Sequence, residues 1–266
     1  MKNEILACLS AECPWRDTLY WYDSLDSTNT QAKNMARQGA PHGTVLIAGH
    51  QTAGRGRMGR SFSSPEAKGV YLSVILRPGC SPAELMHLTC AAGVAMAEAV
   101  ENAAGITPGL KWINDLVWKN RKLGGILAEM GLDSKTGMVD YAVVGIGINC
   151  LQAPSDFPAE IQNIATSLRI AAGQEISPAR LAAAMVEALV NMDRDLFSQK
   201  KQRMDRYRTL CITLGQDITV HRADSVRPGK AVGMDDDGGL IVTYPDGTSE
   251  TVSSGEVSVR GLYRYI

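Results

Sequence analysis

Gly54-Arg-Gly-Arg-Met-Gly59 is the stretch that first constrains the fold, because it satisfies G-x-G-x-x-G and follows an apolar run at 44–48 that is typical of a β-strand. In a dinucleotide-binding fold this pattern opens a helix, and an acidic residue about 20 positions further on binds the ribose. Here Arg60-Ser-Phe-Ser-Ser-Pro65 follows, which does not begin a helix, and no acidic residue lies at that spacing. The stretch therefore argues against a dinucleotide fold, and the chain has no P-loop motif.

The same stretch is more typical of a loop that binds an anion. Its glycines let the backbone approach a ligand closely, and its arginines carry rigid forks of donors that suit carboxylate and phosphate oxygens. From Ser27 to Pro65 the chain has no acidic residue, whereas its basic residues there are Lys33, Arg37, Arg55, Arg57 and Arg60. On a chain of net charge −1 this local excess predicts a site for a small anion, with a solvated surface loop as the simpler alternative.

Outward from the loop, helical and strand-like segments alternate, which predicts a mixed α/β domain. Asp26-Ser-Thr-Asn29 supplies helix N-caps before a short helix at 30–38. Ser81-Pro-Ala-Glu84 is a capping box that predicts the start of a longer helix, ending near residue 103. Further strands are expected at 44–48, 70–76, 110–113, 116–118, 125–130 and 141–148, and a further helix is expected from Ser177-Pro178.

The character of the sequence changes near Cys211. From there to Ile266 only short strand-like runs occur, separated by the turn signals Arg-Pro-Gly, Asp-Asp-Gly-Gly and Pro-Asp-Gly. Closely spaced strands over about 55 residues predict a small β-barrel. We therefore expect an N-terminal extension at 1–18, an α/β domain with a mixed central sheet at 19–210, and a small β-domain at 211–266.

The bulk composition excludes several classes of protein. The 266 residues are 45% hydrophobic and 21% charged, which is ordinary for a globular protein, and the near-zero net charge disfavours a general nucleic-acid binder. The first 16 residues lack the apolar run of a signal peptide, and no membrane span is expected. The six cysteines form no CxxC pair and have no histidine at metal-ligand spacing, so we expect free thiols in a reducing cytoplasm.

Two further motifs, Lys111-Trp-Ile-Asn-Asp115 and Arg121-Lys-Leu-Gly-Gly125, flank one predicted hairpin. Lys111 alternates with apolar neighbours and so needs solvent or an anionic partner, while the Asn-Asp pair is equally typical of an ordinary turn. Lys122 precedes two glycines where a ligand can approach the backbone closely. Asn149 ends the buried strand Gly145-Ile-Gly-Ile-Asn149, which is a frequent position for ligand contacts but also the pattern of a simple strand end.

In this order the motifs resemble those of the biotin protein ligase family, from about Tyr20 to Asn149 and less strongly over the C-terminal segment. The resemblance implies a catalytic domain with a central mixed sheet covered by helices, followed by an SH3-like barrel. It also implies two reaction steps. Biotin and MgATP give biotinyl-5′-AMP and pyrophosphate, and a lysine of a biotin carboxyl carrier protein then attacks the mixed anhydride.

The resemblance also assigns roles to matching residues. Those expected to contact biotin are Ser27, Thr28, Asn29, Gln51, Arg55, Gly56, Arg57 and Lys122. Those expected to bind the nucleotide are Arg57, Arg60, Lys111, Asn114, Asn149 and Arg260. Catalytic roles are expected for Arg55, Arg57, Lys122 and Asp115, and Asp115 is also the expected Mg²⁺ ligand. The loop at 54–60 resembles the family's ligand-binding loop, which is typically mobile until biotin or the adenylate orders it.

These residue types suit the implied chemistry. The ureido ring of biotin has one carbonyl and two N–H groups, which neutral donors and acceptors can match. Joining a carboxylate to a phosphate brings two anions together, which the arginines and Lys122 would offset. The incoming lysine must lose a proton, and we expect Asp115 or the phosphate to orient it. The chain departs from the family pattern at Ile113, usually proline, and at Met58, often arginine; we expect the first to be tolerated and the second to weaken the loop's charge modestly.

Three alternatives from other classes are open. A biotin-dependent repressor has a helix-turn-helix module before the catalytic domain, but only some twenty residues precede the matching region, so we expect the ligase-only type with no DNA partner. A lipoate or octanoate ligase shares the fold, although its loop lacks the Gly-Arg alternation. RNA binding is disfavoured by the neutral charge and the few aromatic residues of the β-domain. Family members are often homodimers, so a homodimer is one expected state.

Overall fold

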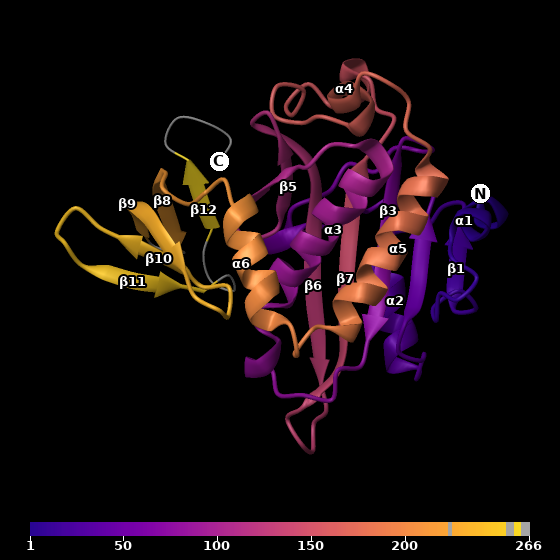
Figure 1. Cartoon of the computed structure of the whole chain (residues 1–266), viewed down its shortest axis with the longest axis horizontal. Coiled ribbons are helices and arrows are strands. Elements are labelled where there is room, and N and C mark those ends of the chain that lie inside the picture. The colour runs from indigo at the N-terminus through magenta and orange to yellow at the C-terminus, as the bar shows by residue number, and fades with distance from the viewer. Residues whose placement is uncertain (223–224, 254–257, 262–266) are drawn as a thin grey trace.

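The computed structural model describes residues 1–222, 225–253 and 258–261, with residues 258, 260 and 261 described by their backbone alone. Figure 1 shows a larger α/β part beside a smaller part made of strands. The helices are α1 (Lys2–Cys8), α2 (Thr28–Arg37), α3 (Leu88–Ala104), α4 (Leu168–Ala172), α5 (Pro178–Arg194) and α6 (Lys200–Leu210), with 3₁₀ turns η1 (Arg57–Gly59), η2 (Ala83–Leu85) and η3 (Pro154–Asp156).

The larger part contains a seven-stranded sheet in the order β1-β2-β3-β7-β6-β5-β4. Its strands are β1 (Leu19–Tyr22), β2 (Thr44–Ala48), β3 (Gly69–Leu76), β4 (Gly109–Lys111), β5 (Asp115–Trp118), β6 (Arg121–Leu132) and β7 (Val139–Asn149). Strands β1 and β2 are parallel and the other pairs are antiparallel, so the expected mixed sheet is confirmed.

Alternation along the strands divides the apolar core between the two faces of this sheet. On one face, Val144 and its neighbours pack against the long helices α3 and α5. On the other face, Ile75 and Val143 pack against Ala32 and Ala36 of α2. Because α2 has only ten residues, it covers part of that face and leaves the adjoining part open. The candidate site lies on this open part.

Helix α3 starts later than its capping box predicts. The backbone N–H of Ser81 donates to Glu84 (2.9 Å) and the backbone N–H of Glu84 lies 3.4 Å from the Ser81 hydroxyl, but the next turn is the 3₁₀ turn η2 and α3 begins at Leu88. The segment Ala83–Ala104 is long and apolar enough to cross a membrane by length and composition alone. However, 72% of its most apolar window is buried inside the protein, because α3 packs between the sheet, α5 and α6. Its apolar character is therefore explained by its central position.

The first 18 residues, which we expected to form an extension, contain the unpredicted helix α1. This helix packs against α5, and Ile5, Leu9 and Trp15 belong to the main core. The segment is too short for its helix to be visible as a periodic pattern, so only the packing against α5 reveals its role.

The smaller part is a five-stranded antiparallel sheet in the order β11-β10-β9-β8-β12, which confirms the small β-domain. Its strands are β8 (Asp217–Arg222), β9 (Ser225–Met234), β10 (Leu240–Thr243), β11 (Ser249–Val252) and β12 (Ser258–Gly261). The turn before β10 contacts the larger part, since the indole N–H of Trp112 donates to the Gly238 carbonyl (2.9 Å). The backbone N–H of Trp112 also donates to the Thr213 hydroxyl (3.0 Å). Both bonds involve the segment between β4 and β5, which adjoins the candidate site.

Candidate functional site

The floor of the site is a patch of β-sheet where glycines allow side chains to lie directly on the backbone. Gly145 of β7 is in register with Ser73 of β3. A Cβ atom on Gly145 would lie 1.7 Å from Oδ1 of Asn29, and a Cβ atom on Gly147 would lie 2.5 Å from the ring of Phe62. Any larger residue at either glycine would therefore displace a side chain of the site.

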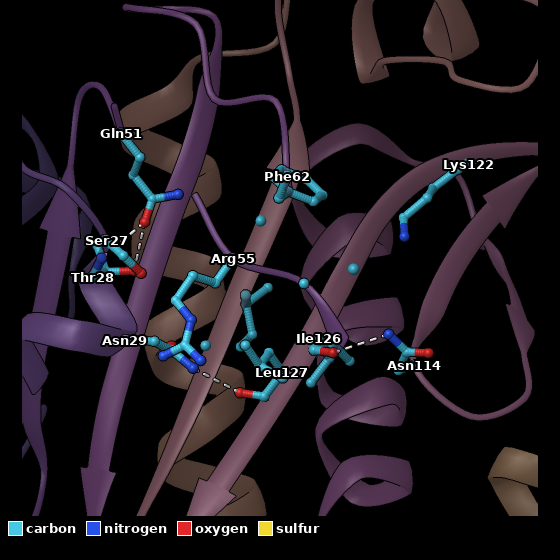
Figure 2. A pocket seen from close by; sticks show the side chains of 15 residues that line it. Ser27, Thr28, Asn29, Gln51, Arg55, Phe62, Asn114, Lys122, Ile126 and Leu127 are labelled. Carbon is cyan, nitrogen blue, oxygen red and sulfur yellow. Dashed lines mark hydrogen bonds between the residues drawn. The ribbon is translucent and has the colours of Figure 1, made fainter. Parts of the chain in front are cut away.

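Above this floor lies a small pocket that is open to solvent (Figure 2). Seven of the eight residues expected to contact biotin line it: Ser27, Thr28, Asn29, Gln51, Arg55, Gly56 and Lys122. The eighth, Arg57, donates from NH1 to Oδ1 of Asn114 (3.2 Å), which also lines the cavity. In Figure 2 Ser27, Thr28 and Gln51 lie at one end and Lys122 at the other, and the side chain of Arg55 runs toward Asn29.

The neutral end is held by side-chain hydrogen bonds around the start of α2. Oε1 of Gln51 accepts from the backbone N–H (2.8 Å) and the hydroxyl (3.1 Å) of Thr28, and Nε2 of Gln51 donates to the Ser64 hydroxyl (2.9 Å). Ser27 is the N-cap of α2, yet its hydroxyl makes no capping bond. An N-cap serine ordinarily satisfies a helix N–H in this way, so the hydroxyl of Ser27, which lines the cavity, is available to a ligand.

A carboxylate that the sequence analysis did not find contacts two residues of the cavity wall. Nδ2 of Asn29 donates to Glu129 Oε2 (3.0 Å) and to the Leu127 carbonyl (3.1 Å). Glu129 also forms an ion pair with Lys33 (2.7 Å) and lies 3.5 Å from NH1 of Arg55. Burial raises the pKa of Glu129, but the hydrogen bonds from Lys33 and Asn29 and the charge of Arg55 outweigh it, so the pKa is below its ordinary value. The period-two alternation of β6 offered a signal, because 125, 127 and 129 share one face.

The arginine-rich stretch folds back on itself as a short hairpin. Phe62 donates its N–H to the Gly54 carbonyl (2.8 Å), and Gly56 donates to the Arg60 carbonyl (2.7 Å). At the tip, Met58 adopts a left-handed backbone (φ 53°) and its side chain is 61% exposed. The hairpin explains the glycine spacing, since a Cβ atom on Gly54 would lie 2.4 Å from the Phe62 carbonyl oxygen.

The opposite end of the cavity concentrates charge. Nζ of Lys122 donates to Oδ1 of Asp115 (2.7 Å) and lies 6.0 Å from the centre of the Phe62 ring. The side chain of Asp115 is only 12% exposed. Burial, together with nearby Arg60, lowers the pKa of Arg57 even though Asp115 acts in the opposite direction. Cations confined in this way interact strongly with an anionic ligand because little water screens them.

Asn149 does not line the cavity. It holds a loop that lies beside Lys122 at the charged end. Its Nδ2 donates to the Thr166 carbonyl (2.9 Å), and its Oδ1 accepts from Gln152 (3.2 Å). The backbone of Lys122 in turn pairs with this loop, donating to Ile164 (2.7 Å) and accepting from Thr166 (2.8 Å). Asn149 therefore holds the loop that positions Lys122.

The remaining expected nucleotide contacts lie around the charged end or outside the described side chains. Lys111 of β4 is in register with Asp115 of β5. Arg60 ends the η1 turn and is exposed. Arg260 pairs through its backbone with Thr219, and its side chain lies outside the described residues.

No group of three or more histidine, cysteine or acidic side chains that could hold a metal ion occurs within residues 1–222, 225–253 and 258–261. The protein therefore provides no metal cage in this part of the chain. Mg²⁺ commonly binds through one or two carboxylates together with substrate phosphates. Asp115 fits that arrangement only with a phosphate group beside it.

Two family models match the chain. The biotin/lipoate A/B protein ligase family matches residues 21–149, and the biotin protein ligase C terminal domain matches residues 213–260. The first match covers the site described above, and the second covers the small sheet.

Named relatives extend the match over almost the whole chain. The bifunctional ligase/repressor BirA of Bacillus subtilis is 37% identical over 257 residues, which cover 95% of this chain and 77% of that protein. The biotin--[acetyl-CoA-carboxylase] ligase of Mycobacterium tuberculosis is 34% identical over 239 residues, covering 87% and 85%. The structure of biotin protein ligase from Aquifex aeolicus in complex with biotin and ATP has a TM-score of 0.77 at 29% identity, covering 91% and 98%.

Proposed function

The chain belongs to the biotin/lipoate A/B protein ligase family, and from this premise we propose how its residues carry out biotin attachment. It is a biotin protein ligase, which activates biotin with ATP and transfers it to a carrier protein. The residue roles below are proposals. They rest chiefly on the gathering of seven expected biotin contacts around one cavity that has a neutral end and a cationic end.

The neutral end is proposed to bind the ureido ring of biotin. Thr28 and Gln51 provide both donors and acceptors there, and the hydroxyl of Ser27 is not used as a helix cap. A ring with one carbonyl and two N–H groups needs such a mixed set. The glycine floor lets Asn29 and Phe62 lie directly on the sheet, so that these two side chains form part of the surface that the ring would meet.

The cationic end is proposed to carry out activation. A carboxylate oxygen of biotin attacks the α-phosphorus of ATP, and pyrophosphate leaves. Lys122 and Arg57 would bring these two anions together and stabilise the charge that develops on the phosphoryl oxygens. We propose that Arg55 reaches over biotin from the hairpin, since it lines the cavity and its side chain runs from the hairpin toward Asn29 in Figure 2.

Asp115 is proposed to act in the second step. The amine of a lysine with a pKa near 10.4 is only about 0.04% neutral at pH 7, so it must be oriented and relieved of a proton before it attacks the acyl carbon and AMP leaves. Asp115 lies beside Lys122 at the charged end and can receive a cationic lysine. If Asp115→Asn slowed adenylation but left transfer from preformed adenylate unchanged, this role would be wrong.

Several finer points belong with this proposal. Biotin protein ligases act on biotin carboxyl carrier proteins, and we propose such a carrier as the partner. Mg²⁺ is proposed to arrive with ATP and to be bound partly by Asp115. A cytoplasmic location is supported by six free thiols, four of them buried. A homodimer is a further prediction, which sedimentation of the purified protein would test.

Biotin-dependent exchange of labelled pyrophosphate into ATP tests the proposed function, with lipoate and octanoate as parallel acids. We expect exchange with biotin and far less with the other two. Exchange with lipoate or octanoate but not biotin would show that the site serves another acid. Absence of exchange in a folded sample with Mg²⁺ would contradict the activity itself.

A further inference from the structure

An ion pair joins the arginine-rich hairpin to the sheet across the candidate site. NH1 of Arg55 in the hairpin lies 3.5 Å from Oε1 of Glu129 in β6. The two side chains are 44% and 23% exposed, so the pair is partly shielded from water. Arg55 lines the cavity, whereas Glu129 contacts the wall residue Asn29 and takes part in neither of the two proposed reaction steps.

The sheet below this pair shows where it lies. Along β7, the positions of Gly147, Gly145 and Val143 form three successive rows on one face, because side chains alternate along a strand. A Cβ atom on Gly147 would lie 2.5 Å from the ring of Phe62, and a Cβ atom on Gly145 would lie 1.7 Å from Oδ1 of Asn29. Phe62 therefore lies over the first row and Asn29 over the second.

The ion pair spans these rows. Arg55 pairs with Ser61 in the hairpin, beside the aromatic ring that lies over the first row. Glu129 is in register with Val143, at the third row. The side chain of Arg55 therefore has to pass above the second row to meet Glu129. Figure 2 agrees with this path, since it shows Arg55 running toward Asn29.

Glu129 is the fixed partner of the pair. Nζ of Lys33 donates to its Oε1 (2.7 Å), and Nδ2 of Asn29 donates to its Oε2 (3.0 Å). Burial raises the pKa of Glu129, but these two hydrogen bonds and the charge of Arg55 leave the pKa below its ordinary value, so the carboxylate is ionised at neutral pH. Arg55 is therefore the group that has to leave when the hairpin opens.

The hairpin has a second attachment at the charged end of the cavity. NH1 of Arg57 donates to Oδ1 of Asn114 (3.2 Å), which lies between β4 and β5. Side chains of the hairpin thus reach the wall at both ends of the cavity. A ligand that lies on the first two rows is covered by the hairpin and by the side chain of Arg55.

We propose that Glu129 is a positioning residue that holds Arg55 across the cavity and thereby gates the passage of biotin. This role rests on the proposed biotin ligase function and deepens it, because it identifies the group that keeps Arg55 over biotin. The ion pair forms without a ligand and spans the rows on which biotin is proposed to lie. It therefore slows entry and release alike and leaves the affinity almost unchanged.

Binding kinetics of biotinamide without ATP test this role. This probe keeps the ureido ring but has no carboxylate, so a change in local charge does not itself alter its attraction to the protein. In Glu129→Gln we expect the association and dissociation rate constants, measured by stopped-flow mixing, each to rise about 3-fold to 5-fold, as for the loss of one partly exposed ion pair. The Kd should stay within about twofold, because the same barrier is lowered in both directions.

Two further variants separate gating from general damage. Glu129→Gln should have no further effect on either rate constant in an Arg55→Gln background, whereas a purely structural role through Asn29 would persist there. Asp140→Asn is the matched control, because it removes the same charge from another ion pair on the same sheet, with Arg77 (2.8 Å).

Salt provides a test that needs no change at Glu129. Raising the ionic strength from about 0.05 M to about 0.5 M screens a partly exposed ion pair. Both rate constants for biotinamide should therefore rise with salt in the wild type and stay constant in Arg55→Gln. If Glu129→Gln does not fold, this comparison decides: equal salt dependence in the two proteins would overturn the gate.

Other outcomes would also overturn it. Rate constants in Glu129→Gln equal to those in Asp140→Asn would show that the pair is no barrier. Faster release alone would show that Glu129 only supports the binding surface, and faster entry alone would show that the pair stays open in the complex. Wild-type protein that bound biotinamide but gave no biotin-dependent pyrophosphate exchange would instead refute the proposed function and leave the gate standing.

Discussion

At the scale of residues, the site is a set of groups whose roles depend on their partners more than on their types. Lys122 is one of several lysines near the hairpin; it donates to the largely buried side chain of Asp115 (2.7 Å) and lies 6.0 Å from the centre of the Phe62 ring. Asn149, expected to bind the nucleotide, has its amide bonded within the protein and holds the loop beside Lys122. Position in the network therefore decides what each side chain can do.

Lys122→Met should lower the rate of adenylation on the order of 100-fold, because it removes a cation from the place where two anions must meet. Pyrophosphate exchange at saturating biotin measures this. Lys119→Met is the matched control, since Lys119 lies on the exposed turn of the same hairpin, over the Trp118 ring (5.9 Å). Equal losses in the two variants would contradict a specific role for Lys122.

The depressed pKa of Glu129 has a consequence for stability. Burial opposes ionisation, but bonds from Lys33 and Asn29 and the charge of Arg55 hold the pKa below 4.5. A carboxylate with a depressed pKa stabilises the fold above its unfolded-state pKa, and this contribution is lost as pH falls through its folded-state pKa. The difference in free energy of unfolding between wild type and Glu129→Gln should thus be constant from about pH 8 to about pH 6 and shrink below about pH 4.5. Urea titrations check this; a difference that grows in acid would contradict it.

At the scale of elements, a short helix and a glycine-bearing strand together create the cavity. Helix α2 begins at the cavity and covers Ile75 and Val143 with its later turns, and the rows of the same sheet face before its start are left with Ser73 and glycines. A longer helix, or ordinary β-residues in those rows, would fill the space. The cavity is thus a product of where α2 begins and of which strand positions lack a Cβ atom.

Gly145→Ala should strongly weaken biotin binding while the protein stays folded. Its Cβ atom would lie 1.7 Å from Oδ1 of Asn29 and must displace that side chain, at a stability cost of about 1–3 kcal/mol. Calorimetry should show a biotin Kd raised on the order of 100-fold. Gly233→Ala in β9 is the control, because its Cβ atom would meet only Ile241 at 3.5 Å. Retained biotin affinity in Gly145→Ala would show that Asn29 is not needed.

At the scale of the whole molecule, the small sheet is attached to the segment between β4 and β5. Trp112 donates to Thr213 and to Gly238, and Gly238 itself has no room for a side chain because a Cβ atom would lie 2.9 Å from the sulfur of Cys90. Ion pairs of Lys200 with Asp237 and of Arg208 with Asp236 lie beside this contact. The C-terminal sheet therefore supports the motif that we propose binds the nucleotide.

Trp112→Phe should weaken this attachment, since it leaves the Gly238 carbonyl without its donor at a cost of about 1–3 kcal/mol. We expect the KM for ATP to rise more than the KM for biotin, because the change lies beside the nucleotide motif and away from the neutral end. Trp118→Phe on β5 is the matched control. An equal rise in both KM values would argue for a general loss of stability instead.

The sequence by itself determined the mixed α/β class, the small C-terminal β-domain and most residues around the cavity. The fold class and the small β-domain follow from local patterns of strand alternation and turn signals. The residues around the cavity follow from the glycine-arginine loop and the other motifs, whose order resembles one family. The sequence predicts that the long helix begins at the capping box of Ser81, whereas α3 begins at Leu88, because a capping box fixes a turn but not which kind of helix follows it.

Only the tertiary structure decided which groups meet. Glu129 and Ser73 escaped notice because each is ordinary in its own segment, and Lys33 was counted only as one of several local positive charges. The three become one network only when α2, β3 and β6 are packed together. The same packing turned α1 into part of the core and engaged the amide of Asn149 within the protein. Local sequence encodes backbone conformation through short-range interactions, whereas the partners, burial and direction of a hydrogen bond depend on residues about 100 positions apart, as for Asn29 and Glu129.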